Sequence, residues 1–363
     1  MTLGLVVGGC VEGEKDLGGI AALGNTEGMA RVQMDVIGTE ADGLNIPRDL
    51  DFNPENPGEL WVVNRADDST STFFDAGTDS QESLHIIDPF ALHFMEEVSS
   101  IAFGDPQLFG TCQESRNTYD HHHPSDDFMG PTLWTSVLDI YGKTNPEAVE
   151  ELDYDLGSHI DMLHQTPLCM GIAWEVDNVY WVFDGSTGSI QRNDFVDDHG
   201  PGYDHHSDGI IAHYVRGEVA RVEDVPSHLA YDAATGLLYI ADTGNSRIAV
   251  LDTTTGTRGA DLPVMEPGTT YYEMDGATLT TLVEGELVEP SGVDLFDDTL
   301  IVTDHATGIV WAFDLQGNEL DRVDLGLGEG LMGVEVVDRE EIWLVHADDN
   351  ELLRLTPKLP ADE

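Results

Sequence analysis

The chain repeats one short pattern of strands and turns along most of its 363 residues. The clearest copy runs from Pro226 to Asp252, where three apolar segments are separated by turns rich in Gly, Asn and Ser. Short apolar runs between such turn residues are typical of β-strands. A period of tens of residues indicates that each copy is one structural unit whose apolar face is covered by its neighbours. The repeats therefore constrain the fold more strongly than the chain length does.

Five further copies follow the same order of an inner strand and a returning strand, and they begin at Pro47, Ser99, Met170, Pro290 and Met332. The copy at Pro226 closely resembles the NHL repeat, which forms one blade of a β-propeller, and the similarity covers most of the chain. The resemblance implies an all-β, NHL-like, six-bladed β-propeller. The insertion around Pro146 has helix-forming residues, and we expect one short helix there.

The last copy ends at Leu355 with no sequence left for a fourth strand, although a propeller blade has four antiparallel strands. The segment 30–37 has strand composition. We predict that it pairs with the last blade and closes the ring, which removes open sheet edges. The expected organisation is a lipoprotein-type signal remnant and flexible tether (1–28), the propeller (29–358) and a C-terminal tail (359–363).

Acidic residues outnumber basic ones 70 to 15, which gives a formal net charge of −55. Such a surface repels nucleic acid phosphates and anionic lipid headgroups, so we exclude nucleic acid as a partner. The charge is consistent with solubility in a salty medium or with cation binding, and both interpretations stay open. A hydrophobic content of 40% is sufficient for a folded core.

The cysteines point to an extracytoplasmic protein. Small residues before Cys10 resemble the end of a bacterial lipoprotein signal, so we expect a secreted or lipid-anchored protein of the cell envelope, with an accidental match as the alternative. Membrane contact is expected only through this anchor. Cys112 and Cys169 form either a disulfide or a pair of buried free thiols.

Dispersed histidines are the main candidates for chemistry. In a propeller, the starts of inner strands and the ends of second strands share one face. We expect five histidines to lie on that face, near the central channel: His159, His164, His228, His305 and His346. Neutral imidazoles from separate blades can converge on a divalent metal such as zinc, copper or iron. The alternative is that they are hydrogen-bonded core residues.

Two histidine-rich loops extend this set. The run His121, His122 and His123 is expected on the same face; neighbouring side chains alternate in direction, so His121 and His123 are the candidate metal ligands. The acidic segment 197–208 is expected on the opposite face. It is either a calcium-binding loop or an acidic surface loop.

Two arginines stand out in a chain with so few basic residues. Arg48 starts the inner strand of the first blade and Arg65 ends its second strand, so both are candidates for binding a carboxylate or phosphate at the mouth of the channel. The alternative is that they neutralise nearby aspartates. A polar residue recurs at the ends of second strands. We interpret it as structural, because its side chain can accept hydrogen bonds from turn N–H groups. The four residues are Asn64, Asp184, Asp242 and Asp304.

NHL propellers include the peptidyl-hydroxyglycine amidating lyases, which hold zinc with blade histidines beside an arginine. The segment 60–67 looks like the lyase segment that carries this arginine, and Pro226-Ser-His228-Leu resembles one of its zinc-ligand segments, with Ser227 intervening here. The resemblance implies a catalytic role for Arg65 and a metal-ligand role for His228.

Three functional hypotheses remain at this stage, and whether the protein is an enzyme stays open. The first is a metal-dependent, lyase-like enzyme in which Arg65 orients an anionic group. The second is a non-catalytic propeller that binds a small molecule, peptide, carbohydrate or protein at the channel mouth. The third is a scaffold in an envelope assembly. We expect a monomer. No phosphate-binding loop, nucleophile elbow or zincin helix occurs in the sequence.

Overall fold

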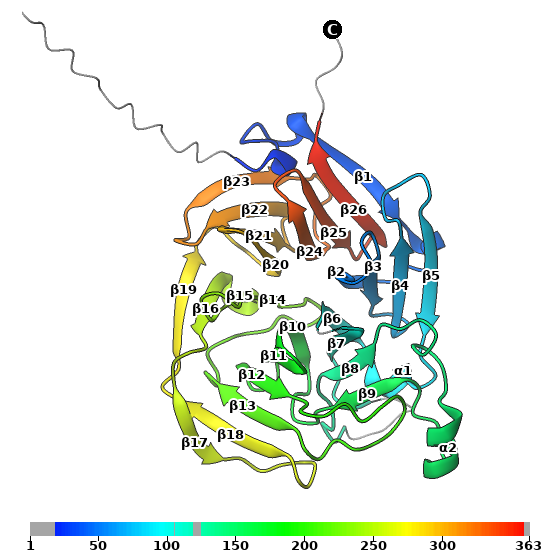
Figure 1. The fold of residues 1–363 in the computed structure, drawn as a ribbon. Helices are drawn as coiled ribbons and strands as arrows, with labels where there is room; N and C mark the ends of the chain where they lie inside the picture. Colours follow the sequence, from blue (N-terminus) through cyan, green and yellow to red (C-terminus); the bar gives the residue numbers. More distant parts are fainter. Residues whose placement is uncertain (1–18, 105, 119–124, 359–363) are drawn as a thin grey trace, which may run out of the picture.

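The computed structural model describes residues 19–104, 106–118 and 125–358, which form a ring of six sheets around a central axis (Figure 1). Five sheets have four strands and one has six. In each blade the first strand lies nearest the axis and successive strands lie farther out (Figure 1). The predicted six-bladed β-propeller is confirmed.

The first three blades follow the chain from the centre outward. Blade 1 consists of β2 (Pro47–Phe52), β3 (Leu60–Asn64), β4 (Ser69–Phe74) and β5 (Glu82–Ile87). Blade 2 consists of β6 (Val98–Phe103), β7 (Leu108–Gln113), β8 (Thr132–Thr135) and β9 (His159–Met162). Blade 3 contains β10 (Cys169–Val176), β11 (Val179–Asp184), β12 (Ser189–Asp194) and β13 (Ile210–Tyr214).

The other three blades complete the ring. Blade 4 consists of β14 (Leu229–Asp232), β15 (Leu237–Asp242), β16 (Arg247–Asp252) and β19 (Thr278–Glu284). Blade 5 consists of β20 (Pro290–Phe296), β21 (Thr299–Asp304), β22 (Ile309–Asp314) and β23 (Glu319–Asp324). Blade 6 consists of β24 (Leu331–Asp338), β25 (Glu341–His346), β26 (Glu351–Pro357) and β1 (Val32–Gly38).

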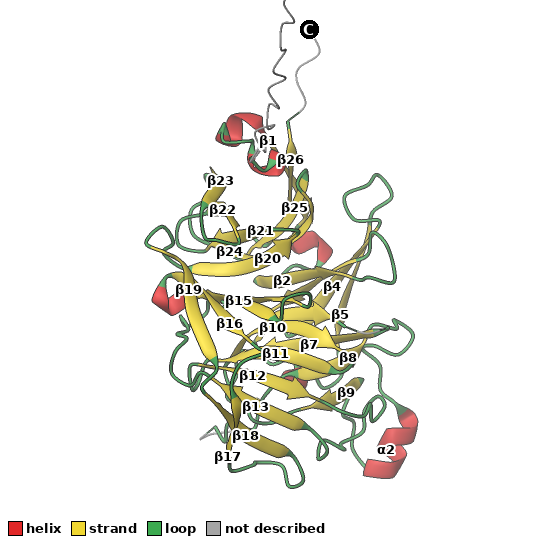
Figure 2. Cartoon of the chain, turned by 60° about the vertical axis from the view of Figure 1, so that its left-hand side comes forward, coloured by secondary structure: helices red, strands yellow, loops and turns green. Residues whose placement is uncertain are grey.

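The N-terminal strand supplies the missing fourth strand of blade 6, as predicted. β1 pairs antiparallel with β26, from Val32 opposite Pro357 to Gly38 opposite Leu352 (Figure 2). Residues 19–28, which the sequence assigned to a tether, also pack on the ring: Ile20 and Leu23 are buried, and the Ile20 N–H donates to Asp321 Oδ2 at 3.0 Å. The other tether residues and Cys10 lie outside the described residues.

Blade 4 contains an insertion that enlarges blade 3. Between β16 and β19 the chain forms the hairpin β17 (Thr257–Asp261) and β18 (Thr270–Asp275). β18 pairs in parallel with β13, so the sheet of blade 3 has six strands. This hairpin was not predicted, because its residues are exposed or half-buried and lack the apolar pattern of the other strands.

Helices are few and short. The predicted helix at Pro146 is confirmed as α2 (Pro146–Leu152), which has proline in its first turn and the Asn145 side chain as its N-cap. The only other α-helix in the described part of the chain is α1 (Ala91–Phe94). Four 3-10 turns complete the elements of the described residues: Ala21–Leu23, Gly28–Arg31, Glu40–Asp42 and Thr243–Asn245. Within the described residues, no helix is long and apolar enough to cross a membrane.

Asp184 and Asp304 accept hydrogen bonds from N–H groups of the following turn, as predicted for the polar residues at second-strand ends. Asn64 and Asp242 instead accept from the N–H groups of Asn45 and Ala220, which precede them in the chain. Asp184 accepts hydrogen bonds from the N–H groups of Ser186 and Thr187 in the following turn. Asp304 accepts from Val288 N–H at 2.6 Å in the preceding loop. These buried side chains therefore hold the turns and loops around the second strands of blades 1, 3, 4 and 5.

Cys112 and Cys169 form a disulfide, with their Cα atoms 5.1 Å apart. Cys112 lies near the end of β7 and Cys169 begins β10, so the bond links blades 2 and 3. Both residues are fully buried. Of the two alternatives left open by the sequence, the structure has the disulfide.

Candidate functional site

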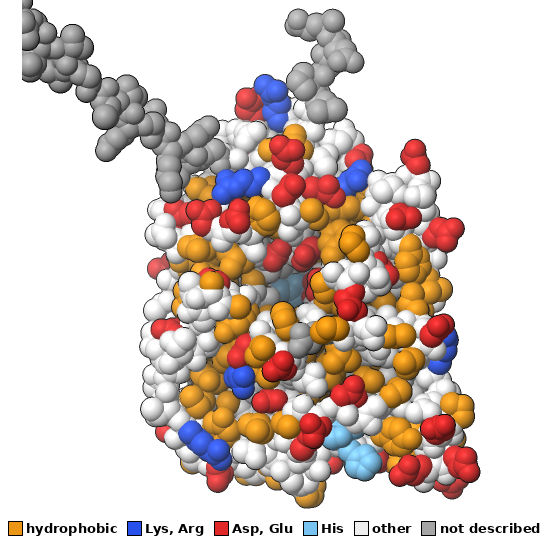
Figure 3. Space-filling model, in the orientation of Figure 1, with side chains coloured by type: hydrophobic (Ala, Val, Ile, Leu, Met, Phe, Trp, Pro, Cys, Tyr) orange, Lys and Arg blue, Asp and Glu red, His pale blue; other side chains and the backbone are white. Residues whose placement is uncertain are grey.

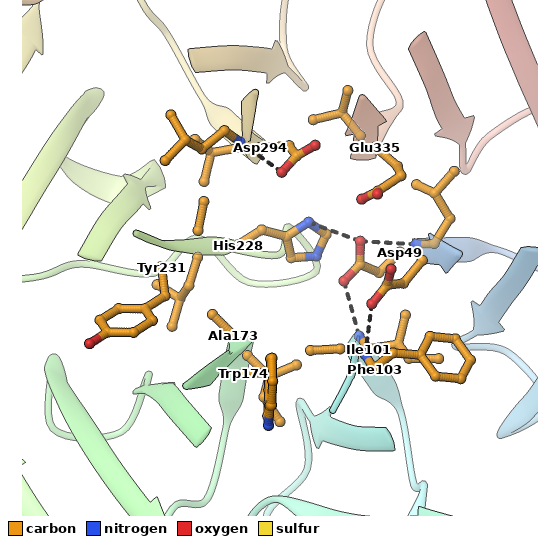
Figure 4. A pocket seen from close by; sticks show the side chains of 18 residues that line it. Asp49, Ile101, Phe103, Ala173, Trp174, His228, Tyr231, Asp294 and Glu335 are labelled. Carbon is orange, nitrogen blue, oxygen red and sulfur yellow. Dashed lines mark hydrogen bonds and ion pairs between the residues drawn. The ribbon is translucent and has the colours of Figure 1, made fainter. Parts of the chain in front are cut away.

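A cavity of about 270 Å³ lies on the axis of the ring, lined by residues of all six inner strands (Figure 4). Four carboxylates and one histidine face it: Asp49, Asp51, Asp294, Glu335 and His228. Acidic and histidine side chains are visible around and inside the central opening of the surface (Figure 3). No lysine or arginine lines this cavity.

Three of the channel carboxylates connect neighbouring blades. Asp49 and Asp51, in blade 1, accept hydrogen bonds from the N–H groups of Ile101 and Phe103 in blade 2, at 3.0 and 2.7 Å. Asp294 accepts from Val336 N–H of the next blade at 2.8 Å. Burial raises the pKa of each carboxyl, that of Asp51 to about 7. The inner strands of neighbouring blades are thus joined by hydrogen bonds to aspartate side chains whose raised pKa values favour the protonated form.

His228 lies in the channel, as the sequence predicted. Its Nε2 lies 3.1 Å from the carbonyl oxygen of Ser99 and therefore carries the proton, and its Nδ1 lies 3.4 Å from Asp49 Oδ1. Burial lowers the pKa of His228 to about 4. The imidazole is therefore neutral near pH 7, and its nearest carboxylate comes from the opposite side of the channel in blade 1 (Figure 4).

Replacement of Asp51 by asparagine should stabilise the protein more at pH 8 than at pH 5. The Asp51 pKa is about 7 in the folded state against an ordinary value of 3.8, so the folded state holds a proton that the unfolded chain has lost in this range. Stability therefore falls as the pH rises from about 4 to about 7 and stays reduced above that. A pKa difference of about three corresponds to at most about 4 kcal/mol.

Chemical denaturation of the two proteins at both pH values measures this difference. The lowered pKa of His228 destabilises the fold as the pH falls from 6.5 toward 4, but it does so equally in both proteins. Asp79→Asn, at an exposed turn position, is the control. An equal effect of Asp51→Asn at the two pH values would contradict the prediction.

A second histidine group lies at the outer edge of blades 2 and 3. His159 belongs to β9, the outermost strand of blade 2, and His164 follows it. They are packed with His93, which follows blade 1, and with His206 of the β12–β13 loop; the ring centroids of His164 and His206 are 5.3 Å apart. The expectation that His159 and His164 lie at the channel is therefore wrong. Between β7 and the next inner strand, β10, the chain supplies two outer strands of blade 2, β8 and β9.

Burial lowers the pKa of three histidines of this group. The pKa of His93 falls to about 4, and the pKa values of His159 and His164 lie well below the ordinary value. The imidazoles are therefore neutral, which is the form that binds metals. His159 Nε2 and His164 Nδ1 are buried and have no hydrogen-bond partner among the described residues. Phe94 and Phe128 stack on these two rings.

One group in the described part of the chain has the geometry of a metal site. Ligand atoms of Asp161, His199 and Asp208 all lie within 4.8 Å of one another. His199 Nε2 is 2.9 Å from Asp208 Oδ1 and 3.6 Å from Asp161 Oδ2. Asp161 comes from β9, whereas His199 and Asp208 come from the β12–β13 loop, so two blades contribute.

Asp161 is the centre of this group. It is fully buried, and its Oδ2 has no hydrogen-bond donor among the described residues. Its Oδ1 accepts from Met162 N–H at 2.6 Å and lies 2.8 Å from His206 Nδ1. Burial raises the pKa of Asp161, although His206 and His199 favour its ionised form. A cation bound at Oδ2 would complete the contacts of this carboxylate.

The segment 197–208 was expected on the face opposite to His159 and His164, but the two lie together because His159 starts a fourth strand and not an inner strand. His206 of that segment contacts Asp161, between the two histidines. The loop joins the third and fourth strands of blade 3 as predicted, but it folds across to blade 2. The sequence feature that indicated this site was the alternation of His and Asp in the loop. Asp161 could not be identified from the sequence, because a single aspartate in a strand has no distinguishing pattern.

The remaining histidine candidates do not meet one another. His305 Nδ1 lies 2.8 Å from Glu289 Oε2, in blade 5. His346 ends β25, and its imidazole ring lies against the backbone of Gly330. A Cβ atom added to Gly330 would lie 2.7 Å from that ring, and the φ of +125° at Gly330 also favours glycine. His121 and His123 lie outside the described residues. Of the predicted histidines that the structure describes, only His228 lines the central cavity.

The two arginines differ in their surroundings. Arg65 forms ion pairs with Asp224 at 2.7 Å, Glu97 at 3.4 Å and Glu114 at 3.8 Å. It therefore neutralises acids, as the alternative interpretation held, although these acids come from blades 2 and 3 rather than from the adjacent sequence. Arg48 is buried near the start of β2 and forms no ion pair with a described residue.

Comparison with known proteins identifies structures of the same fold. No family model matches the sequence, and no curated protein sequence matches it. Virginiamycin B lyase from Staphylococcus aureus is 10% identical with a TM-score of 0.52, over 90% of this chain and 99% of that chain. An auxiliary nutrient binding protein from Bacteroides ovatus is 11% identical with a TM-score of 0.54, over 91% of this chain and 77% of that one.

A calcium-binding protein, regucalcin, from Agrobacterium tumefaciens is 10% identical with a TM-score of 0.52, over 89% of this chain and 93% of that chain. At these identities the likeness extends to the backbone and not to particular side chains. The chain is thus similar in fold to propellers that include enzymes and binding proteins, and the comparisons establish the β-propeller fold alone.

Proposed function

We propose that this protein is an extracytoplasmic, NHL-type propeller that binds a divalent transition metal through Asp161, His199 and Asp208. The observation that carries the proposal is the convergence of these three side chains, from two blades, around a buried carboxylate oxygen without a hydrogen-bond donor. One nitrogen and two carboxylates suit zinc, manganese or iron(II), whereas calcium prefers oxygen ligands alone. The proposed metal is therefore a transition metal rather than calcium.

The residues around the three ligands fit this role. His206 holds Asp161 Oδ1 at 2.8 Å and so orients Oδ2 toward His199, as partners of metal ligands commonly do. His199 and Asp208 are partly exposed, so a substrate oxygen or water can reach the site. A bound metal would supply Lewis acidity there, which supports a lyase-like or hydrolytic reaction.

Two findings support the extracytoplasmic part of the proposal. A buried disulfide is typical of oxidising compartments. The resemblance of residues 1–10 to a lipoprotein signal adds a lipid anchor at Cys10. Mass spectrometry of protein extracted from the membranes of the source cells tests the anchor. An unlipidated Cys10 in material with its native start would contradict it.

Metal analysis of protein purified without a histidine tag tests the proposed site. We expect one equivalent of zinc, manganese or iron after dialysis. His199→Ala and Asp161→Asn should each weaken metal affinity, measured by calorimetry, by at least about 100-fold, since each removes a direct ligand. His206→Ala should weaken it by about 10- to 100-fold, because it removes an orienting contact.

His305→Ala is the matched control, because His305 also pairs with a carboxylate but lies in blade 5. Its metal affinity should equal that of the wild type. Two results would contradict the proposal: a wild-type protein that binds none of the three metals, or equal losses in His305→Ala and His199→Ala. The first would favour a non-catalytic ligand-binding propeller.

A further inference from the structure

Arg48 is a buried cation without an anionic partner in the described structure. It is 4% exposed, and the only hydrogen-bond contact of its guanidinium with a described residue is Nη1 to the sulfur of Met332 at 3.4 Å. A thioether sulfur is a weak acceptor, and a guanidinium has five N–H donors. The chain has 70 acidic residues and 15 basic ones, so a shortage of carboxylates does not explain the missing partner.

The neighbouring arginines are all paired, which makes Arg48 the exception. Arg65 contacts Asp224 at 2.7 Å, and Arg221 contacts Glu114 at 2.5 Å. Glu114 also accepts the Asp224 N–H and lies 3.8 Å from Arg65. Two of the acids near Arg48, Glu114 and Asp224, are thus committed to other groups.

Arg48 lies at the end of the channel where the inner strands begin, which we call the entry end, next to the residues that line the cavity. It precedes Asp49, which faces the cavity, and it is close enough to His228 to lower the pKa of that imidazole. Burial, reinforced by Arg65, lowers the pKa of Arg48 itself to about 10, whereas Glu114 and Asp224 nearby favour its charged form. The guanidinium is therefore charged at neutral pH.

We propose that Arg48 anchors a binding site for a small organic carboxylate at the entry end of the channel. A buried charge without a partner destabilises a fold, and a carboxylate can pair with a guanidinium through two parallel hydrogen bonds. The ligand should carry a single negative charge, because Glu114, Asp224 and Asp348 surround the arginine and would repel a doubly charged phosphate. This site is separate from the proposed metal site at the outer edge.

Calorimetric titration of EDTA-treated protein with acetate and benzoate, at low ionic strength, tests the site without any contribution from a bound metal. We expect saturable binding of at least one of the two to one site. Arg48→Met should weaken that binding at least about tenfold, and Arg48→Lys at least about fivefold, because lysine lacks the planar pair of donors. Inorganic phosphate should bind more weakly than the carboxylate.

Arg192→Gln is the control, because Arg192 already forms two hydrogen bonds to Glu175, at 2.7 and 2.9 Å, and should not affect binding. Arg48→Met should melt at the same temperature as the wild type or higher, since it removes a buried unpaired charge. A structural role for Arg48 would instead lower it. The proposal is overturned if the wild type shows no saturable binding up to about 10 mM of either carboxylate. Unchanged affinity in Arg48→Lys, or tighter binding of phosphate, would also overturn it.

Discussion

Deletion of residues 28–38 is expected to abolish the cooperative unfolding transition of the protein. Without β1, the outer edge of β26 loses its antiparallel partner from Leu352 to Pro357. Each lost backbone hydrogen bond costs about 1 kcal/mol. Val32 also leaves the core, and the buried side chains of Leu353 and Leu355 are left beside an open sheet edge. Together these losses are comparable with the total stability of a typical domain, about 5–15 kcal/mol.

Circular dichroism and calorimetry of the deletion variant measure this effect. A synthetic peptide of residues 28–38 should restore a melting transition when added in trans, because it supplies the strand β1 that the variant lacks. The rescue distinguishes a missing strand from general damage to the chain. A normal melting curve for the deletion variant alone would refute the closure of the ring by β1.

Replacement of both Cys112 and Cys169 by serine should lower the free energy of unfolding by about 4 kcal/mol. The bond closes a loop with a sequence separation of 57 residues, and the chain-entropy relation gives this value for a loop of that length. Both positions are fully buried, so the serine hydroxyls add a penalty for polar groups in an apolar site. The effect should appear as a lower urea midpoint with a somewhat steeper slope, because the unfolded chain is less compact without the bond.

Reduction of the wild type provides an independent measurement. Denatured, unreduced protein should show neither Cys112 nor Cys169 as a free thiol, and reduced wild type should match the double variant apart from the hydroxyl penalty. If the thiol assay found both cysteines reduced, the bond and the compartment inferred from it would be incorrect. Cys112→Ala with Cys169→Ala separates the loss of the bond from the burial of hydroxyls.

The sequence alone was sufficient for the architecture of the ring. Alternating apolar segments and Gly-rich turns recur in every blade, because each blade must bury the same kind of face against its neighbours. The missing strand after Leu355 and the spare strand at 30–37 predicted the closure that β1 provides. The helix at Pro146 was predictable for the same reason, since propensity and capping are local.

The candidate site was only partly predictable. The geometry of one blade correctly placed His228 in the channel, because that residue immediately precedes an inner strand. The same argument placed His159 there, although it starts an outer strand of blade 2. The two residues share the same kind of sequence position before an apolar run. The difference lies in which strand that run becomes.

What the sequence by itself determined is therefore the set of local units and their circular order, because strand period, turn chemistry and apolar burial act over a few residues. Only the tertiary structure decided that Asp161 meets His199 and Asp208, and that Arg48 lacks an ion pair while Arg65 has three. These contacts depend on how long loops fold across from one blade to another. Such loops have no periodic pattern, so their paths are set by the surfaces against which they pack.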